Sequence, residues 1–199
     1  MNTPAIQRAV KTFQKKGRPL RSSEAIDFGI HPRTLYAMRD SGILRQLTRG
    51  VYALSDTPIN NPDIVTIAVR VPKGVVCLIS ALSFHNITTQ IPHAVHIAIP
   101  RDSKCHIDYP PVKVYSYAKE SYREGIEKHD ISGVQVKVYS AEKTVADCFK
   151  FRNKIGIDVA VEALRFCKTR KKSTPRQFLR YARICRVENI MMPYLEALI

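Results

Sequence analysis

The chain has 199 residues, 45% of them hydrophobic and 25% charged, as is typical of a folded protein with one or two domains. Its longest uncharged apolar run, residues 75–82, is far too short to span a bilayer, and its first residues have no apolar signal-peptide core. We therefore expect a cytoplasmic protein that does not contact a membrane. The five cysteines form no CxxC pair, which favours neither a disulfide framework nor a zinc knuckle.

The formal net charge of +15 is concentrated at the two ends of the chain. Residues 1–57 carry 10 Lys or Arg against 4 Asp or Glu, and residues 136–199 carry 14 against 6. The middle of the chain is close to neutral. Such an excess usually indicates a polyanionic partner, most often nucleic acid, although basic residues can also simply solvate a surface.

The first segment predicts two short helices. Ile6, Ala9, Val10 and Phe13 recur at helical spacing within residues 4–16, and Gly17 follows as a stop. A second helix is expected to begin at Ser22 or Ser23, because either hydroxyl can cap free backbone amides, and to end by Gly29.

A third helix and a hairpin follow. Pro32 suits the first position of a helix and Gly42 its C-terminal stop. Leu35 and Met38 then share an apolar face. The stretches LRQL and VYAL predict two strands around Thr48-Arg49-Gly50, where glycine permits a tight turn. Three short helices and a hairpin predict a winged helix-turn-helix domain.

In that fold the third helix enters the major groove, while the wing and the helix starts contact phosphates. We expect base contacts from the exposed side of the third helix: Arg33, Thr34, Tyr36 and Ala37. We expect phosphate contacts from five further residues: Ser22, Arg39, Arg45, Thr48 and Arg49. A winged helix that serves only protein contacts is the alternative, because fold does not imply function.

These residues resemble a known family. Arg33-Thr34-Leu35-Tyr36, Gly42 and Arg49-Gly50-Val51-Tyr52 are similar to the N-terminal domain of AbiE-type (AbiEi) antitoxins of bacterial type IV toxin–antitoxin, or abortive infection, systems. Later in the chain, residues 80–85 (SALSFH) resemble that family's S-A-L-x-x-H segment, and residues 138–147 (VYSAEKTVAD) its V-x-x-x-E-K-T-x-x-D helix start. The resemblance covers nearly the whole chain.

The resemblance implies a transcriptional repressor that binds inverted repeats of double-stranded DNA in its own promoter. It also implies a C-terminal domain associated with antitoxicity. The implied toxin is a nucleotidyltransferase-like protein, which such antitoxins oppose without a stable complex.

Residues 57–62 (TPINNP) form a turn-rich link, so we expect domains at 1–57 and 62–199. Beyond the link, the pattern predicts a helix at 62–71, capped by Asn61, and a short helix at 80–86. Alternating strands are expected at 93–100, 112–117 and 134–139, with a weaker candidate at 125–131. A helix capped by Ser140 follows, then helices at about 157–168, 175–186 and 188–198. The expected fold class is α+β, with a winged helix-turn-helix followed by a small mixed sheet and C-terminal helices.

A possible second basic surface lies near the C-terminus. Arg176, Arg180 and Arg183 fall on one helix face, preceded by Arg170, Lys171 and Lys172. This surface is either a solvated basic face or a second DNA contact, and RNA or the toxin is a third possible partner.

Enzymatic alternatives are less well supported. A metal-dependent nuclease guided by the winged helix would use Gln135-Val136-Lys137 with Asp130, or Asp102-Ser103-Lys104, but neither has a second well-placed acid. His93 and His96 would point to opposite faces of a strand, while His85 and Cys148 are typical of a core. We therefore predict no catalytic residues, no metal and no cofactor. A basic module that binds the toxin is the remaining alternative.

Overall fold

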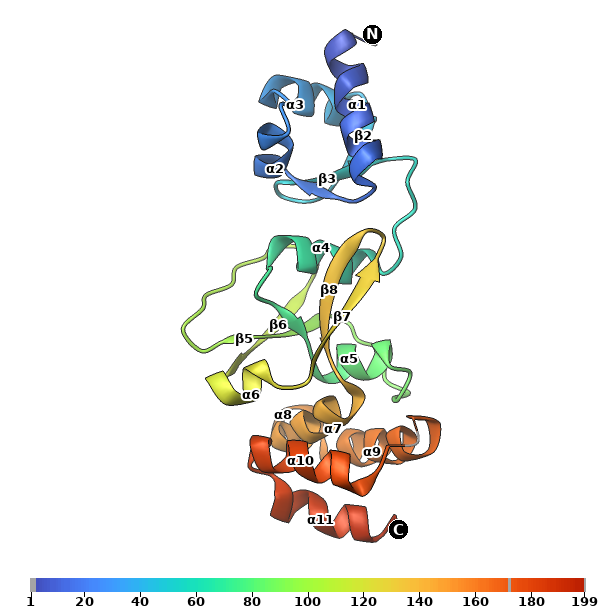
Figure 1. Ribbon diagram of the computed structural model, residues 1–199, viewed down its shortest axis with the longest axis vertical. Helices are drawn as coiled ribbons and strands as arrows, with labels where there is room; N and C mark the ends of the chain where they lie inside the picture. The colour runs from blue at the N-terminus through green and yellow to red at the C-terminus, as the bar shows by residue number, and fades with distance from the viewer. Residues whose placement is uncertain (1–2, 172, 199) are drawn as a thin grey trace. The chain divides into compact units, whose positions relative to one another are not determined.

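The computed structural model describes residues 3–171 and 173–198 (Figure 1). These residues form two compact units. The first unit contains residues 3–72 together with 107–110 and 129–136, and the second contains the remaining described residues. The sequence places a boundary in the link at 57–62, whereas the compact first unit continues past that link to Pro72.

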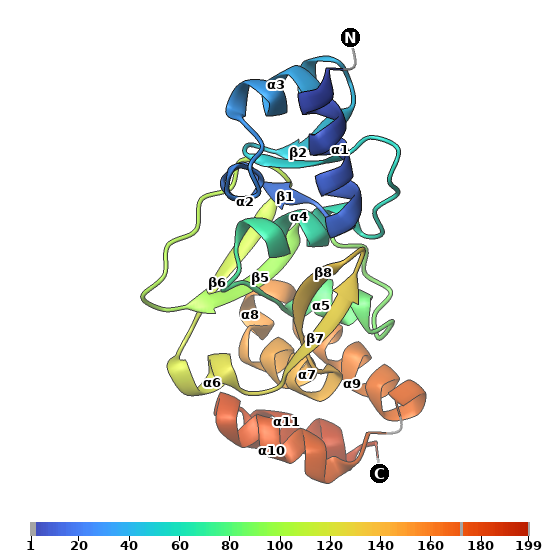
Figure 2. The same cartoon turned by 45° about the horizontal axis from the view of Figure 1, so that its top comes forward.

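The first unit begins with three helices and a three-stranded sheet. The elements in chain order are α1 (Pro4–Lys16), β1 (Leu20–Arg21), α2 (Ser22–Asp27), α3 (Pro32–Asp40), β2 (Leu44–Thr48), β3 (Val51–Leu54) and α4 (Pro62–Arg70). The sheet has the order β1-β3-β2, and both strand pairs are antiparallel. Figure 2 shows α1, α2 and α3 grouped around this sheet. The helix and hairpin predictions for residues 4–54 are confirmed.

The core of this unit is built from the apolar faces that the sequence pattern predicts. Phe13 of α1 and Leu35 and Met38 of α3 are at most 2% exposed, and they pack with Leu20 and Leu44 from the strands. Each fully buried side chain of this size contributes about 1.5–3 kcal/mol. The helices are therefore held to the sheet by a continuous apolar core.

At the starts of α2 and α4, the observed helix caps differ from the predicted ones. Helix α2 begins at Ser22 itself with Arg21 at the N-cap position, because the Glu24 carboxylate accepts the Arg21 backbone amide at 3.0 Å. Asn61 precedes α4 in a left-handed conformation (φ 47°) and makes no side-chain cap hydrogen bond. In both cases the expected short side chain is not the acceptor at the helix start.

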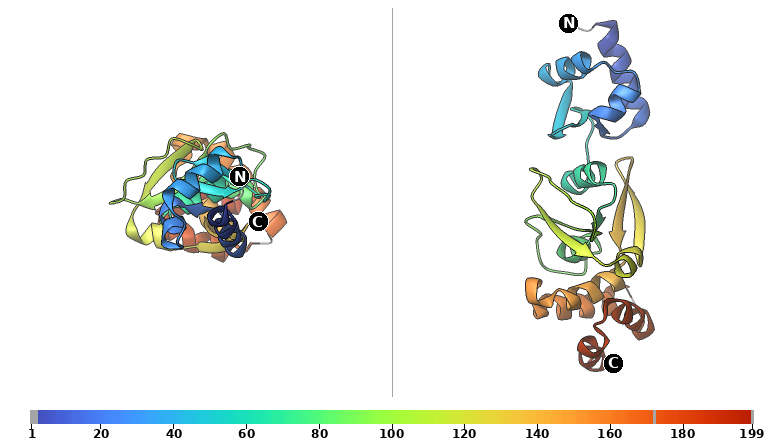
Figure 3. Two further views of the ribbon diagram at one scale, coloured as in Figure 1. Left: turned by 90° about the horizontal axis from the view of Figure 1, so that it is seen from above. Right: turned by 90° about the vertical axis from the view of Figure 1, so that its left-hand side faces the viewer.

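The second unit combines a sheet with helices. Its elements are β4 (Val75–Val76), α5 (Leu78–Phe84), β5 (Val95–Pro100), β6 (Val112–Tyr117), α6 (Lys119–Arg123), β7 (Ile126–Ile131), β8 (Val134–Tyr139), α7 (Ala141–Lys150), α8 (Arg152–Ile155), α9 (Ile157–Lys171), α10 (Pro175–Cys185) and α11 (Glu188–Glu196). The tip of the β7–β8 hairpin, residues 129–136, is grouped with the first unit. Figure 3 shows α9, α10 and α11 gathered at one end of this unit.

The sheet is mixed, as the sequence predicts, with the strand order β6-β5-β4-β8-β7. β5 pairs parallel with β6 and antiparallel with β4, and β4 pairs parallel with β8. The expected alternation in β5 is wrong, because its first five residues are all buried. β5 has a neighbouring strand on each side and α5 packed against it, so few of its side chains can reach solvent.

A buried ion pair lies in the first turns of α7. Ser140 caps this helix by accepting the Lys143 backbone amide at 3.3 Å, as predicted. The side chains of Lys143 and Asp147 are fully buried, with Nζ 2.6 Å from Oδ2, and the Cys185 thiol donates to Asp147 at 3.2 Å. The ammonium group also lies 4.3 Å from the ring centroid of Tyr139.

Removing one partner of this pair should be costly. Asp147→Asn leaves the Lys143 ammonium buried without a counter-charge, and we expect a loss of about 3–5 kcal/mol in the free energy of unfolding. Urea denaturation of the full chain measures this loss. The double variant Lys143→Met/Asp147→Leu should lose clearly less, and an equal loss in both variants would contradict the role of the charge pair.

The pH dependence of stability should report on His96. Burial and the nearby positive charge of Lys113 lower the pKa of His96 to about 4. The unfolded chain therefore binds this proton at higher pH than the folded chain, so stability is full at neutral pH and falls as the pH drops from about 6.5 towards 4. The expected loss on acidification to pH 4 is about 3 kcal/mol.

Urea denaturation at neutral pH and at pH values between these limits measures this loss. His96→Gln should be less stable at neutral pH but should depend less on pH over the same interval. If the variant and the unmodified protein lose the same stability on acidification, His96 is not the group responsible.

Candidate nucleic-acid interface

Helix α3 is anchored by one face and exposes the other. Leu35 and Met38 are its buried side chains, whereas Arg33, Ala37 and Tyr36 are exposed, the last at 47%. Arg33, Tyr36 and Ala37 therefore lie together on the solvent-exposed face of α3. Of the four residues predicted to contact bases, Thr34 alone is half-buried.

The start of α3 is fixed by a local hydrogen bond. The Nδ1 atom of His31 accepts the backbone amide of Arg33 at 3.2 Å, and Pro32 occupies the first helical position. The imidazole therefore acts as the N-cap of α3, a role that was not predicted for His31. The signal was present as a polar side chain directly before the proline.

Arg39 is predicted to contact a phosphate, but in the structure its side chain already has local partners. Its guanidinium forms an ion pair with Asp40 at 2.8 Å and lies 5.2 Å from the ring centroid of Tyr36. Arg39 thus links its own acidic neighbour to the exposed aromatic ring. Its charge is therefore partly balanced by Asp40.

The wing is short. Thr48 pairs with Val51 across the β2–β3 hairpin, which leaves Arg49 and Gly50 as a two-residue turn, and Gly50 has the φ of 75° that such a turn requires. Arg49 is exposed at the tip. The Ser22 backbone amide donates to the Gly50 carbonyl at 2.9 Å, so the start of α2 and the wing are joined.

Two of the predicted wing contacts are modified by the structure. Thr48 is only 9% exposed, because it ends a strand and faces inward beside a bulge, so its hydroxyl is poorly placed for a phosphate. Arg45 is exposed, and its guanidinium donates to the Thr57 carbonyl at 2.7 Å. Of the two wing arginines, Arg45 is thus engaged by a backbone carbonyl, whereas Arg49 is exposed at the tip of the turn.

The basic residues of α1 were not predicted to belong to any site. Arg8, Lys11, Lys15 and Lys16 are exposed on this helix, and the Lys16 ammonium lies 3.8 Å from the ring centroid of Phe28 in the segment after α2. They add to the positive charge of the same unit. In the sequence these residues form the polar face of an amphipathic helix. Such a pattern does not distinguish a solvated face from a binding face.

Three of the six residues predicted for the second basic surface lie together in the second unit. Arg176, Arg180 and Arg183 line a hollow of about 710 Å³ on α10, together with the partly exposed Leu179 and Ile184. Arg180 pairs with Glu124 at 3.0 Å and Arg183 with Glu188 at 2.9 Å.

The residues that precede α10 in sequence do not all join this surface. Arg170 donates to the Asn86 carbonyl at 2.7 Å and stacks on Phe166 at 3.8 Å, so it is directed to a different part of the unit. Lys171 is exposed at the end of α9, and Lys172 lies outside the described residues.

The residues considered for enzymatic chemistry have local structural contacts. Asp130 accepts the Gly133 amide and the Gln135 side chain, both at 3.1 Å, which places it in the turn of the β7–β8 hairpin. Buried His85 contacts the Tyr139 carbonyl at 2.7 Å, in agreement with a core histidine, and Cys148 is fully buried. Within residues 3–171 and 173–198, no group of three or more His, Cys, Asp or Glu could hold a metal ion.

Helices α1–α3 with the β1-β3-β2 sheet and its short hairpin define a winged helix-turn-helix domain. Residues 7–55, which span nearly all of these elements, match the family model described as transcriptional regulator, AbiEi antitoxin. The predicted resemblance is confirmed over this segment. No curated protein matches the chain. Across the described ranges, no helix combines the length and apolar character needed to cross a membrane.

Proposed function

We propose that the protein is a sequence-specific DNA-binding repressor that acts on its own promoter. The observation that carries the proposal is the exposed face of α3, with Arg33, Tyr36 and Ala37, next to a wing that projects Arg49. This surface belongs to a segment that matches a regulator family and carries a marked excess of basic residues. A duplex is the polyanion that fits a helix of this kind.

In the proposed complex α3 lies in the major groove. Arg33, near the N-terminal end of the helix, is placed to donate two hydrogen bonds to a guanine, and Tyr36 and Ala37 to contact apolar base edges. Arg49 contacts a phosphate along the flanking backbone, because a two-residue turn is too short to read a groove deeply. Inverted repeats would position two copies of the chain on one operator.

We further propose that α10 supplies a second cationic contact. Its three arginines lie on one helix face and border a common hollow. A second contact in the C-terminal part would account for the basic excess at both ends of the chain. We place the antitoxin activity of a type IV toxin–antitoxin system in the same protein, opposing a nucleotidyltransferase-like toxin without a stable complex, on the strength of the family resemblance.

Arg33→Ala should relax sequence preference. Loss of a bidentate base contact is expected to cost about 1–3 kcal/mol on the operator and little on scrambled DNA. Fluorescence anisotropy titrations on the DNA upstream of the protein's own gene, with scrambled DNA in parallel, measure the difference. Arg101→Ala, which removes the same charge from an exposed residue outside the proposed interface, should change neither affinity.

An equal loss of affinity on both DNAs for Arg33→Ala would assign Arg33 to the phosphate backbone instead. Equal affinity of the unmodified protein for operator and scrambled DNA would contradict the repressor proposal itself.

Arg49→Ala should weaken binding to every sequence by a similar factor. Because a phosphate contact releases a condensed counterion, the slope of log affinity against log salt should fall by about one. The titrations are repeated over a series of salt concentrations, again with Arg101→Ala as the charge-matched control. An unchanged salt slope would show that the wing does not lie on the phosphate backbone.

A further inference from the structure

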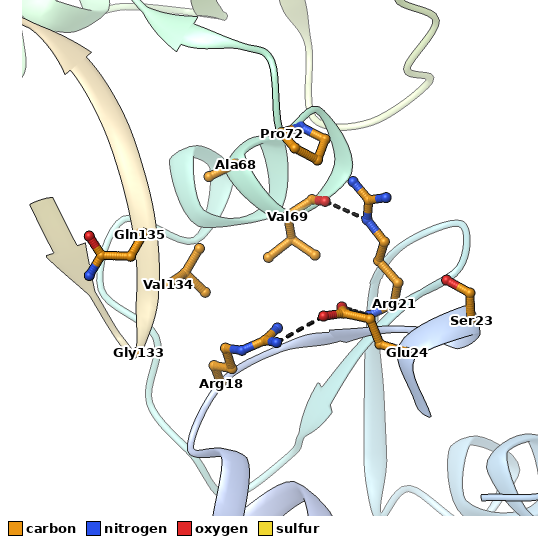
Figure 4. Close-up of a pocket in the computed structure, with 10 residues that line it drawn as sticks. All are labelled: Arg18, Arg21, Ser23, Glu24, Ala68, Val69, Pro72, Gly133, Val134 and Gln135. Atoms are coloured by element: carbon orange, nitrogen blue, oxygen red, sulfur yellow. Dashed lines mark hydrogen bonds and ion pairs between the residues drawn. The ribbon is translucent and has the colours of Figure 1, made fainter. Parts of the chain in front are cut away.

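The first unit contains a cleft that the proposed DNA interface does not use. It has a volume of about 460 Å³ and is formed by the β1–α2 segment, the C-terminal end of α4 and the tip of the β7–β8 hairpin (Figure 4). Its polar side is formed by Arg18, Arg21, Ser23 and Glu24, and its apolar side by Val69, Pro72 and Val134, with Gln135 next to Val134. We call it the α4 cleft. Its volume lies within the range of small-molecule sites.

The two arginines of the α4 cleft are held in place and keep donors to spare. Arg21 donates from Nε to the Val69 carbonyl at 2.6 Å and from Nη2 to the Arg70 carbonyl at 3.1 Å, so it caps the end of α4. Arg18 donates to the Pro19 carbonyl at 3.0 Å and to Glu24 at 2.8 Å. A guanidinium carries five N–H donors, and among the described residues these contacts use two on each arginine.

Glu24 orders the polar side without cancelling its charge. Burial by itself would raise the pKa of this carboxyl, but hydrogen bonds from the Arg18 side chain and the Arg21 amide outweigh burial and lower the pKa. The carboxylate is therefore ionised at neutral pH. Two guanidinium groups and one carboxylate leave the polar side with a net positive charge, which favours an anionic group.

The apolar side of the α4 cleft is held in place by a close approach between the backbone at Gly133 and the Gly17 carbonyl. Gly133 has φ 74°, and a Cβ there would lie 2.9 Å from the Gly17 carbonyl oxygen, so the hairpin tip can pack this closely only with glycine. The Asn60 amide also donates to Ser132 Oγ at 3.1 Å. Val134 and Val69, each 7% exposed, are thereby fixed as an apolar surface across from the arginines.

We propose that the α4 cleft binds a phosphomonoester carried on a flat, weakly polar body, the chemistry of a nucleoside monophosphate. The phosphate accepts hydrogen bonds from Arg18, Arg21 and Ser23, and the flat body lies on Val69 and Val134. A tetrahedral anion with several acceptor oxygens suits two guanidinium groups and a hydroxyl better than a single carboxylate does. This site is independent of the proposed DNA contacts.

Isothermal titration calorimetry of the full chain with adenosine monophosphate tests the proposal. We expect saturable binding with one site per chain, and at least tenfold weaker binding of inorganic phosphate and of adenosine, because each offers only half of the recognised chemistry. Absence of saturable binding, or equal affinity for phosphate or for adenosine alone, would overturn it.

Two variants locate the site. Arg18→Gln should weaken adenosine monophosphate binding by roughly tenfold or more, because it removes a charged donor. Ser23→Asp places a negative charge on the exposed first turn of α2, where acidic residues favour the helix, and should weaken binding at least as much without unfolding the unit. Arg8→Gln removes a charge from the exposed side of α1 and should bind normally. Unchanged binding by both cleft variants would place the ligand elsewhere and refute the site.

Discussion

The burial of two side chains decides which face of α3 is exposed to solvent. Leu35 and Met38 are fully or almost fully removed from solvent, and they fix the rotation of the helix about its own axis. Because an α-helix turns 100° per residue, that rotation places Arg33, Tyr36 and Ala37 outward. The exposed face of α3 is therefore a consequence of core packing, and a substitution at Leu35 or Met38 would reorient exposed residues that neither side chain contacts.

Local contacts further restrict the exposed residues of α3 and the wing. His31 caps α3, the Ser22 amide joins the start of α2 to Gly50 in the wing, and Arg39 is drawn to Asp40 and Tyr36. These contacts reduce the number of conformations available to the exposed residues before any partner binds. A preorganised surface of this kind loses less conformational entropy on association.

In the second unit, the first turns of α7 contribute a charged pair to the interior. Lys143 and Asp147 of the E-K-T-x-x-D segment pair with each other in full burial, under the ring of Tyr139 and against the thiol of Cys185. Replacing both members of such a buried pair by apolar residues is often neutral for stability, whereas removing one member leaves the other charge buried without a partner and is costly.

The sequence by itself determined the elements of the N-terminal domain, the mixed sheet and the three long C-terminal helices. Apolar spacing and the punctuation by Pro32, Gly42 and Gly50 are local properties, readable without knowing what packs on what. Only the tertiary structure decided that Thr48 faces inward, that Arg170 turns to Asn86, that β5 is buried on both faces, and that residues distant in the chain meet in the α4 cleft. The last three depend on contacts between residues far apart in sequence, and the first depends on a bulge in the β2–β3 hairpin. Neither can be predicted from the spacing of residues along a single segment.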